Sequence, residues 1–449
     1  MAELRRVLPL RTAVTTSAGL ASAAVNFFAA VEVAQYAGGR SAWLALLVAG
    51  LLITLSAANF SELSGLYPSA AAIRVWMRRG ANDRLSMVGS LVYMMTVVLV
   101  VAADAFVLGH VFTAIVPAVP GLVWIALLLM IVTWANLRGV KVAGYIQDGN
   151  GLFLLGSLMV ISVIGLMHVA PGHFAGVFHL GGGFLQSVAL GVFIFVGFEW
   201  VTPLAEEFTD SRMIPRGMFM ALGLVAVAFG LFTLAQQTLL PQARVAGSLV
   251  PQLLVGQAAL GRLGFWWMVV ASLTTAMTTF NGGFVAASRF VYAAARERVL
   301  PPVLARLNDR LVPQYALLGL FITSLLLAAV VYVSGRYVWL INTGAAVESF
   351  MYVMAGFLVI NLRRREPNRA RPFRVPWGVV IPGLSMLIFF ALGIGSLTAA
   401  SDLPGPVPWS LAFLVMLTAG AVIYVYRVVP RLKARSRVAP APSRPSEAP

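Results

Sequence analysis

The sequence predicts an all-α membrane protein that crosses the bilayer many times. Of its 449 residues, 60% are hydrophobic and 11% are charged, whereas soluble domains average roughly 45–50% and about 25%. Many apolar runs reach about 20 residues, which is enough for a helix to cross roughly 30 Å of hydrocarbon. Both observations favour a polytopic helical protein over a set of soluble domains.

Length and apolarity predict twelve transmembrane helices. They are expected at 12–37, 42–66, 85–112, 121–139, 145–169, 184–205, 217–239, 264–294, 314–333, 337–361, 378–399 and 408–428. The N-terminus, the C-terminus and the loops after the even-numbered helices, together with the helix ends that adjoin them, hold 28 of the 32 Lys and Arg residues. By the positive-inside rule, both termini are cytoplasmic. We therefore expect a multi-pass protein of the cell membrane, and we interpret the net charge of +16 as a topology signal and not as nucleic-acid binding.

The expected organisation is one membrane domain with short ends. A cytoplasmic N-terminus of residues 1–11 precedes a single transmembrane domain of twelve helices at 12–430, and the Pro-, Ser- and Arg-rich segment 431–449 is predicted to be a disordered cytoplasmic tail. The chain has no cysteine, and we find no nucleophile or metal-ligand constellation. We therefore expect neither an enzyme nor a cofactor or metal site.

The sixth predicted helix carries an interruption. Gly197 and Pro203 flank the sequence FEWVT, and proline removes a helical hydrogen bond and clashes with the carbonyl four residues earlier. Unpaired backbone at this depth is tolerated only where it lines a cavity or is buried in protein. A solute site is one interpretation of this pattern, and a packed proline kink is the other.

The first predicted helix contains a stretch of small residues, TTSAGLASAAVN, at 15–26. Small side chains let a solute or another backbone come close. Small-xxx-small helix packing explains the same pattern, so both interpretations stay open for this segment alone.

Carboxylates inside the predicted helices are the second clue to function. Asp104, Glu199 and Glu348 lie deep in the third, sixth and tenth helices, and each costs about 2.5–3.5 kcal/mol to insert. Such residues mark solute or proton routes, or are neutral carboxyls bonded to a neighbouring helix. Thr278 and Thr279 in the eighth helix are candidates for cation or substrate coordination, although threonines in helices often bond back to their own carbonyls.

Four segments together resemble one family. They are FSELSGLYPSAAAIRVW at 60–76, NLRGVK at 136–141, GFEWVTPLAEEFTDSRMIPRG at 197–217 and NGGFVAASRFVYAAARERVLP at 281–301. In this order and spacing, they resemble the amino acid–polyamine–organocation (APC) superfamily of permeases, over about residues 10–430.

The resemblance implies a leucine-transporter-type fold. Helices 1–5 and 6–10 would form inverted repeats, with helices 1 and 6 discontinuous and helices 11 and 12 appended. A substrate would lie between the two interruptions. The implied substrate-binding residues are Ser22, Ala23, Ala24, Asn26, Phe193, Gly197, Phe198, Glu199 and Trp200.

The same resemblance bears on individual positions. Ser22, Ala23 and Ala24 fall where the family has Gly-Ser-Gly, so both glycines are replaced here. Phe193 matches an aromatic that closes over the substrate, and Glu199 matches an acidic position linked to proton-dependent gating.

The coupling ion does not follow from the family. Proton-coupled relatives often hold a lysine in helix 5, where this chain has Phe153 and Leu154 in that region. A proton or sodium gradient is the expected energy source, and the candidate coupling residues are Glu199, Asp104, Thr278, Thr279 and Glu348.

We therefore expect a secondary active amino-acid transporter that works by alternating access and couples to protons. The alternatives are a cationic amino acid, amine or polyamine exchanger of the same superfamily and, in a different class, a channel or a transporter-derived sensor. The expected partners are a small-molecule substrate and the lipid bilayer. The substrate, symport against exchange, and the oligomeric state stay open.

Overall fold

The computed structural model describes residues 6–37, 40–248, 250–399, 403, 405 and 407–438. Across these residues, the regular structure is helical, apart from one isolated β-bridge between Leu8 and Phe208. The prediction of an all-α polytopic membrane protein is confirmed.

Ten helical segments among the described residues are long and apolar enough to cross a membrane. They are α3 (Ala42–Leu66), α5 (Asp83–Ile115), α7 (Val140–Met167), α8 (Phe184–Val192) with η2 (Phe193–Phe195) and η3 (Phe198–Leu204), α9 (Met213–Leu239), α11 (Pro251–Arg296), α12 (Gln314–Ser334), α13 (Val338–Arg365), α14 (Val380–Thr398) and α15 (Trp409–Arg427).

The other two expected spans also have helical counterparts. The fourth is the 17-residue helix α6 (Gly121–Leu137). The first is divided into α1 (Leu10–Leu20) and α2 (Asn26–Tyr36). Short helices fill the connections: α4 (Ile73–Gly80), η1 (Pro171–Phe174), α10 (Gln242–Ala246), η4 (Pro302–Ala305) and α16 (Val429–Val438).

Two boundaries differ from the sequence-based expectation. In α11 the backbone is non-helical at Leu260 and Gly261, so a short helix precedes the span expected at 264–294. The first residues of the expected tail, up to Val438, belong to α16. Residues 439–449 of that tail and 1–5 of the N-terminus lie outside the described residues.

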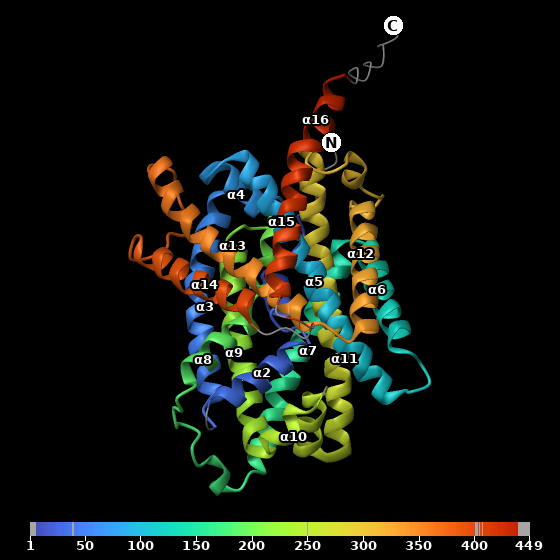
Figure 1. Cartoon of the computed structure of the whole chain (residues 1–449), viewed down its shortest axis with the longest axis vertical. Coiled ribbons are helices and arrows are strands. Elements are labelled where there is room, and N and C mark those ends of the chain that lie inside the picture. The colour runs from blue at the N-terminus through green and yellow to red at the C-terminus, as the bar shows by residue number, and fades with distance from the viewer. Residues whose placement is uncertain are drawn as a thin grey trace.

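Helix α4 and the last described helix, α16, lie at one end of the helix bundle, and α10 lies at the other (Figure 1). We call these ends the termini face and the opposite face. A continuous apolar core extends from Leu8, before α1, to Phe389 in α14. On α14 and α15, by contrast, large apolar side chains such as Leu387 and Ile423 are more than 60% exposed, as expected for helices that face lipid.

Candidate functional site

The first transmembrane helix is broken between α1 and α2, at residues 21–25. Asp104 of α5 holds this break, because its Oδ1 accepts a hydrogen bond from the backbone N–H of Val25 at 3.0 Å. Its carboxyl group is fully buried. Asp104 therefore supplies the partner that an interrupted helix removes from its own backbone.

The sixth transmembrane helix breaks at Val196 and Gly197. Val196 is extended, and Gly197 has φ = 102°, a left-handed conformation that favours glycine. After the break the chain continues as the 3₁₀ helix η3, which contains Pro203. The interruption expected from the sequence is present, but residues 198–202 form a tight helix and are not unwound.

One side chain joins the two breaks. Asn26, the first residue of α2, donates from Nδ2 to the carbonyl of Ala21 at 2.9 Å and to that of Ile194 at 3.0 Å. It thereby satisfies one freed carbonyl in each interrupted helix. The two breaks, about 170 positions apart in the chain, are thus parts of one local structure.

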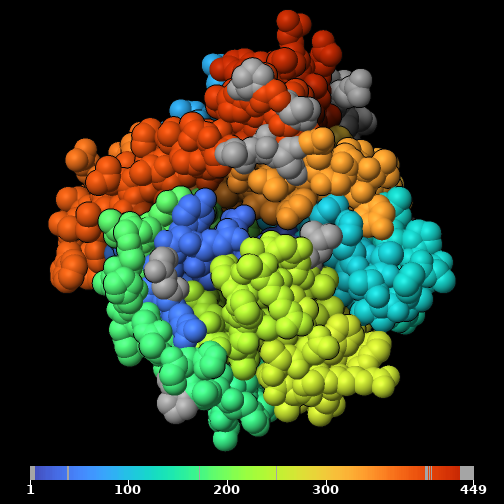
Figure 2. Space-filling view, turned by 60° about the horizontal axis from the view of Figure 1, so that its bottom comes forward, coloured from blue at the N-terminus to red at the C-terminus, as the bar shows by residue number. Residues whose placement is uncertain are grey.

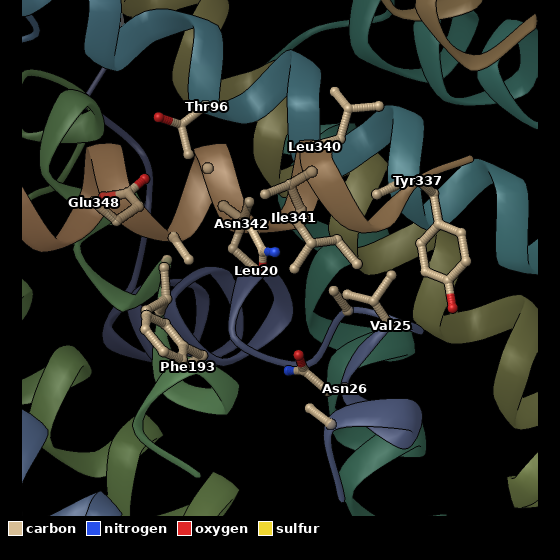
Figure 3. A pocket seen from close by; sticks show the side chains of 18 of the residues that line it. Leu20, Val25, Asn26, Thr96, Phe193, Tyr337, Leu340, Ile341, Asn342 and Glu348 are labelled. Atoms are coloured by element: carbon tan, nitrogen blue, oxygen red, sulfur yellow. The ribbon is translucent and has the colours of Figure 1, made fainter. Parts of the chain in front are cut away.

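A cavity of about 150 Å³ lies beside these breaks. A buried water needs about 10–15 Å³ on the same measure, so the cavity has room for a small solute. Its walls come from both breaks, from α2, from the middle of α5 and from the first three turns of α13. In Figure 3, Ile341 and Asn342 of α13 lie across from Val25 and Asn26, and Phe193 flanks the space.

The cavity approaches the surface on the opposite face. Along α13, Glu348 and Gly344 are buried, whereas Asn342 and Tyr337 are partly exposed, and Glu32 of α2 is exposed. In Figure 2, the blue α2, the orange α12–α13 region and the yellow-green α10–α11 region border a recess.

The predicted substrate-binding residues fall into two groups. Five line the cavity: Ala23, Asn26, Phe193, Gly197 and Trp200. The others, Ser22, Ala24, Phe198 and Glu199, are buried beside it and are not part of its lining. Of the candidate coupling residues, Glu348 lines the cavity, whereas Asp104, Glu199, Thr278 and Thr279 do not.

The 3₁₀ geometry of η3 explains this division. With three residues per turn, side chains three apart share a face. Gly197 and Trp200 accordingly line the cavity, while Phe198 packs with Phe60 and Tyr352, at ring-centroid distances of 6.0 and 5.7 Å.

Glu199 lies in a fully buried cluster. Its Oε1 accepts from the hydroxyl of Tyr93 in α5 at 3.0 Å, and its Oε2 accepts from that of Tyr352 in α13 at 2.7 Å. The cluster ties together three elements, η3, α5 and α13. The carboxyl group of Glu199 therefore connects three helices.

A second carboxyl group adjoins this cluster. Glu348 accepts a hydrogen bond at Oε1 from the indole N–H of Trp200 at 2.9 Å. The Trp200 ring in turn stacks on that of Tyr93, with centroids 4.4 Å apart and planes 15° apart. The carboxyl groups of Glu199 and Glu348 are neighbours within this buried cluster.

The termini face is closed by a further set of contacts. Arg289 of α11 makes two hydrogen bonds, of 3.0 and 3.1 Å, to the carboxylate of Glu207, and both side chains are 1% exposed. The backbone N–H groups of Val7 and Leu8 donate to the carbonyl of Glu207. Arg11 pairs with Asp148 of α7 at 2.8 Å. Residues 7, 8 and 11 are thus bonded to the segment that follows η3 and to α7.

The fifth transmembrane helix, α7, contacts the first through two polar side chains. Gln147 donates from Nε2 to the carbonyl of Thr15 at 3.0 Å, and Asp148 accepts at Oδ1 from the hydroxyl of Thr15 at 2.7 Å. Phe153 is 42% exposed on the outside of the bundle, and Leu154 is buried among apolar side chains.

Gln147 also joins a network of buried amides. Its Oε1 accepts from Asn281 of α11 at 2.9 Å, and the Oδ1 of Asn281 accepts from Asn136 of α6 at 2.8 Å.

The two threonine candidates of α11 donate to backbone carbonyls. The hydroxyl of Thr278 donates to the carbonyl of Thr275 in its own helix at 2.9 Å, and that of Thr279 donates to the carbonyl of Gly19 at 3.3 Å. In the described part of the chain, no group of three or more His, Cys, Asp and Glu residues is arranged to hold a metal ion.

Sequence reasoning missed Tyr93, Tyr352 and Gln147. The signal was available for Tyr93 and Tyr352, since each lies inside a predominantly apolar helix, where buried polar side chains need partners. The partners could not be identified, because Tyr93 and Glu199 are 106 positions apart and Tyr352 and Glu199 are 153 apart.

A bundle of membrane-spanning helices with a small-molecule cavity between two broken helices defines the class of membrane transport proteins. Comparison with known proteins specifies the family. The amino acid permease family model matches residues 13–437, and the chain belongs to this family.

Individual relatives are distant. The chain is 28% identical over 319 residues to human Asc-type amino acid transporter 1, covering 66% of this chain and 57% of the relative. It is 25% identical over 308 residues to the branched-chain amino acid permease BcaP of Bacillus subtilis, covering 66% and 62%. An uncharacterized transporter of Mycobacterium bovis matches at 27% over 413 residues, covering 90% of each chain.

The matches to the first two relatives span about six-tenths of each relative's length. The family and these relatives are permeases and transporters, as the sequence predicted, and not enzymes.

Proposed function

We propose that this protein is a secondary active transporter of amino acids that works by alternating access. The observation that carries the proposal is the cavity between the two helix breaks, which approaches the opposite face and is separated from the termini face by packed side chains. An arrangement accessible from one side only is what one state of an alternating-access cycle requires. A channel would need a path through both faces.

The lining favours a neutral amino acid with an apolar side chain. Leu20, Val97, Phe193, Leu340 and Ile341 supply apolar walls. The relatives whose printed names specify branched-chain and large neutral amino acids agree with this class. The α-carboxylate of such a substrate would be favoured near the N-terminus of α2, where the helix dipole is positive.

Proton coupling is the second part of the proposal. Glu199 links η3 to α5 and α13 through two tyrosine hydroxyls. A change in the charge of Glu199 would therefore weaken or strengthen these contacts, which lie between the cavity and the termini face. Sodium has less support, because the hydroxyls of Thr278 and Thr279 are directed at backbone carbonyls.

The membrane orientation follows from charge. Because the termini face carries most of the Lys and Arg residues, we propose that it is cytoplasmic, and that the protein resides in the cell membrane with both termini inside.

One observation favours the alternative of a cationic substrate. Two carboxyl side chains, those of Glu32 and Glu348, line the cavity, and its lining includes no lysine or arginine. An amine or a cationic amino acid would find opposite charge there.

Competition for uptake tests the substrate class. Purified protein in liposomes takes up a labelled branched-chain amino acid, with excess unlabelled leucine, alanine, arginine, lysine or putrescine outside. The proposal predicts that leucine competes best and that the three cations do not compete. If only the cations competed, the substrate class would be cationic and the proposal of a neutral substrate would be wrong.

A further inference from the structure

We propose that Glu199 and Glu348 form one proton-binding unit, in which Glu348 is the member that exchanges the proton with the cavity. The inference rests on the proposed transport function and adds a second residue, with a defined role, to the coupling step.

Of the four oxygens of the two carboxyl groups, one has no hydrogen-bond donor, so the set of hydrogen bonds lacks one proton. Both oxygens of Glu199 accept from tyrosine hydroxyls, and Oε1 of Glu348 accepts from Trp200. Oε2 of Glu348 is buried and has no N–H or O–H donor among the described residues. A proton on this oxygen, donated to Glu199, would satisfy every polar atom of the pair, and a hydrogen bond between two carboxyl groups requires one such proton.

In the part of the chain that the structure describes, the surroundings of Glu199 and Glu348 offer no other charge that would neutralise the pair. The titratable groups that face the pair are Tyr93 from α5 and Tyr352 from α13. The buried arginine of α11, Arg289, is paired with Glu207, and Asp104 of α5 is bonded to the helix 1 break. Two adjacent carboxylates in a buried, uncompensated site would repel each other strongly, so a single shared proton is the favoured composition.

The position of the pair sets the direction of proton entry. Glu348 and Trp200 line the cavity, and Glu199 does not. A hydrated proton arriving through the cavity reaches Glu348 before Glu199: one O–H bond of the hydronium ion breaks, an O–H bond to the carboxylate forms, and a water molecule stays behind. Through the contact with Glu199, the charge of the pair reaches the tyrosines that hold α5, α13 and η3 together.

The test compares wild-type protein with Glu348→Gln in liposomes. Glutamine keeps a donor toward Glu199 and cannot release it as a proton. We expect Glu348→Gln to lose the stimulation of uptake by an inward proton gradient, while exchange between internal and external substrate is still detected. The double variant with Glu199→Gln should lose no more than the worse single variant, since residues that act as a unit are not additive.

Glu366→Gln is the matched control, because it removes a carboxyl group that is bonded to Tyr67 and lies outside both the pair and the cavity lining. It should keep the wild-type ratio of uptake with and without the gradient. A wild-type ratio in Glu348→Gln would overturn the inference. The inference would also be overturned if the wild-type protein exchanged substrate but its uptake did not respond to the proton gradient. That result would leave the transport function intact.

Infrared spectroscopy of the purified protein in lipid provides a readout that needs no substrate. The wild-type protein at neutral pH should show the carbonyl band of a buried protonated carboxyl group. Glu348→Gln should lose that band and Glu366→Gln should keep it. An identical spectrum for wild type and Glu348→Gln would overturn the shared proton even if no substrate were transported.

Discussion

At the scale of single residues, the buried charged and polar groups of this protein connect helices to one another. Asp104 supports the break of the first helix, Glu199 joins η3 to two tyrosines, and Glu207 is paired with Arg289. The sequence indicated which carboxylates lie deep in the membrane, because each stands alone in an apolar run. It did not indicate their partners, since these come from helices distant in the chain.

The Arg289–Glu207 pair allows a prediction about stability. Replacing Arg289 by Ala leaves a carboxylate that is 1% exposed without its partner, so we expect a loss of about 3–5 kcal/mol in the free energy of unfolding. Thermal unfolding in detergent measures this loss.

The control is Arg296→Ala, which removes the pair with Glu206 at 3.6 Å, where the arginine is 37% exposed. Pairs of this kind contribute about 0–1 kcal/mol. Equal shifts of the melting temperature in the two variants would contradict the role assigned to the buried pair.

At the scale of elements, the two interrupted helices determine where the cavity lies. Gly197 and Pro203 indicated the interruption of the sixth helix, whereas the discontinuity of the first helix followed from the family resemblance. The break observed in helix 1 is confined to residues 21–25, because residues 10–20 are a regular helix. Phe198 was expected at the substrate but packs against Phe60, because the 3₁₀ turn directs Gly197 and Trp200 to the cavity instead.

The break at Gly197 allows a second prediction. Its φ of 102° strains any residue with a side chain, and a Cβ there would lie 3.1 Å from that of Leu20. We expect Gly197→Ala to lower the free energy of unfolding by about 1–3 kcal/mol and to reduce the rate of uptake, because both helix breaks meet at this point.

Gly223→Ala in α9 is the matched control, since a Cβ there would meet no atom within 4 Å. Alanine exceeds glycine in helix propensity by about 1 kcal/mol, so this variant should be as stable as the wild type or more so. A Gly197→Ala protein with unchanged melting temperature and uptake would show that the left-handed turn is not required.

At the scale of the whole molecule, apolar run length predicted the number and order of the spans well. Of the twelve expected, ten correspond to long apolar helices, one to the shorter α6 and one to the pair α1 and α2. The closure at the termini face could not be predicted, because it depends on Leu8, Arg11 and Glu207 meeting residues from distant helices. The resulting structure has a cavity that approaches one face and packed, hydrogen-bonded side chains toward the other.

Uptake by purified protein in liposomes is the measurement that tests this function most directly. A labelled neutral amino acid is added outside, with an inward proton gradient, an inward sodium gradient or no gradient. We expect saturable uptake that rises above the external concentration with the proton gradient and is unaffected by sodium. Saturable uptake that only equilibrates under every gradient, or absence of flux for any amino acid, would contradict a proton-coupled amino-acid transporter.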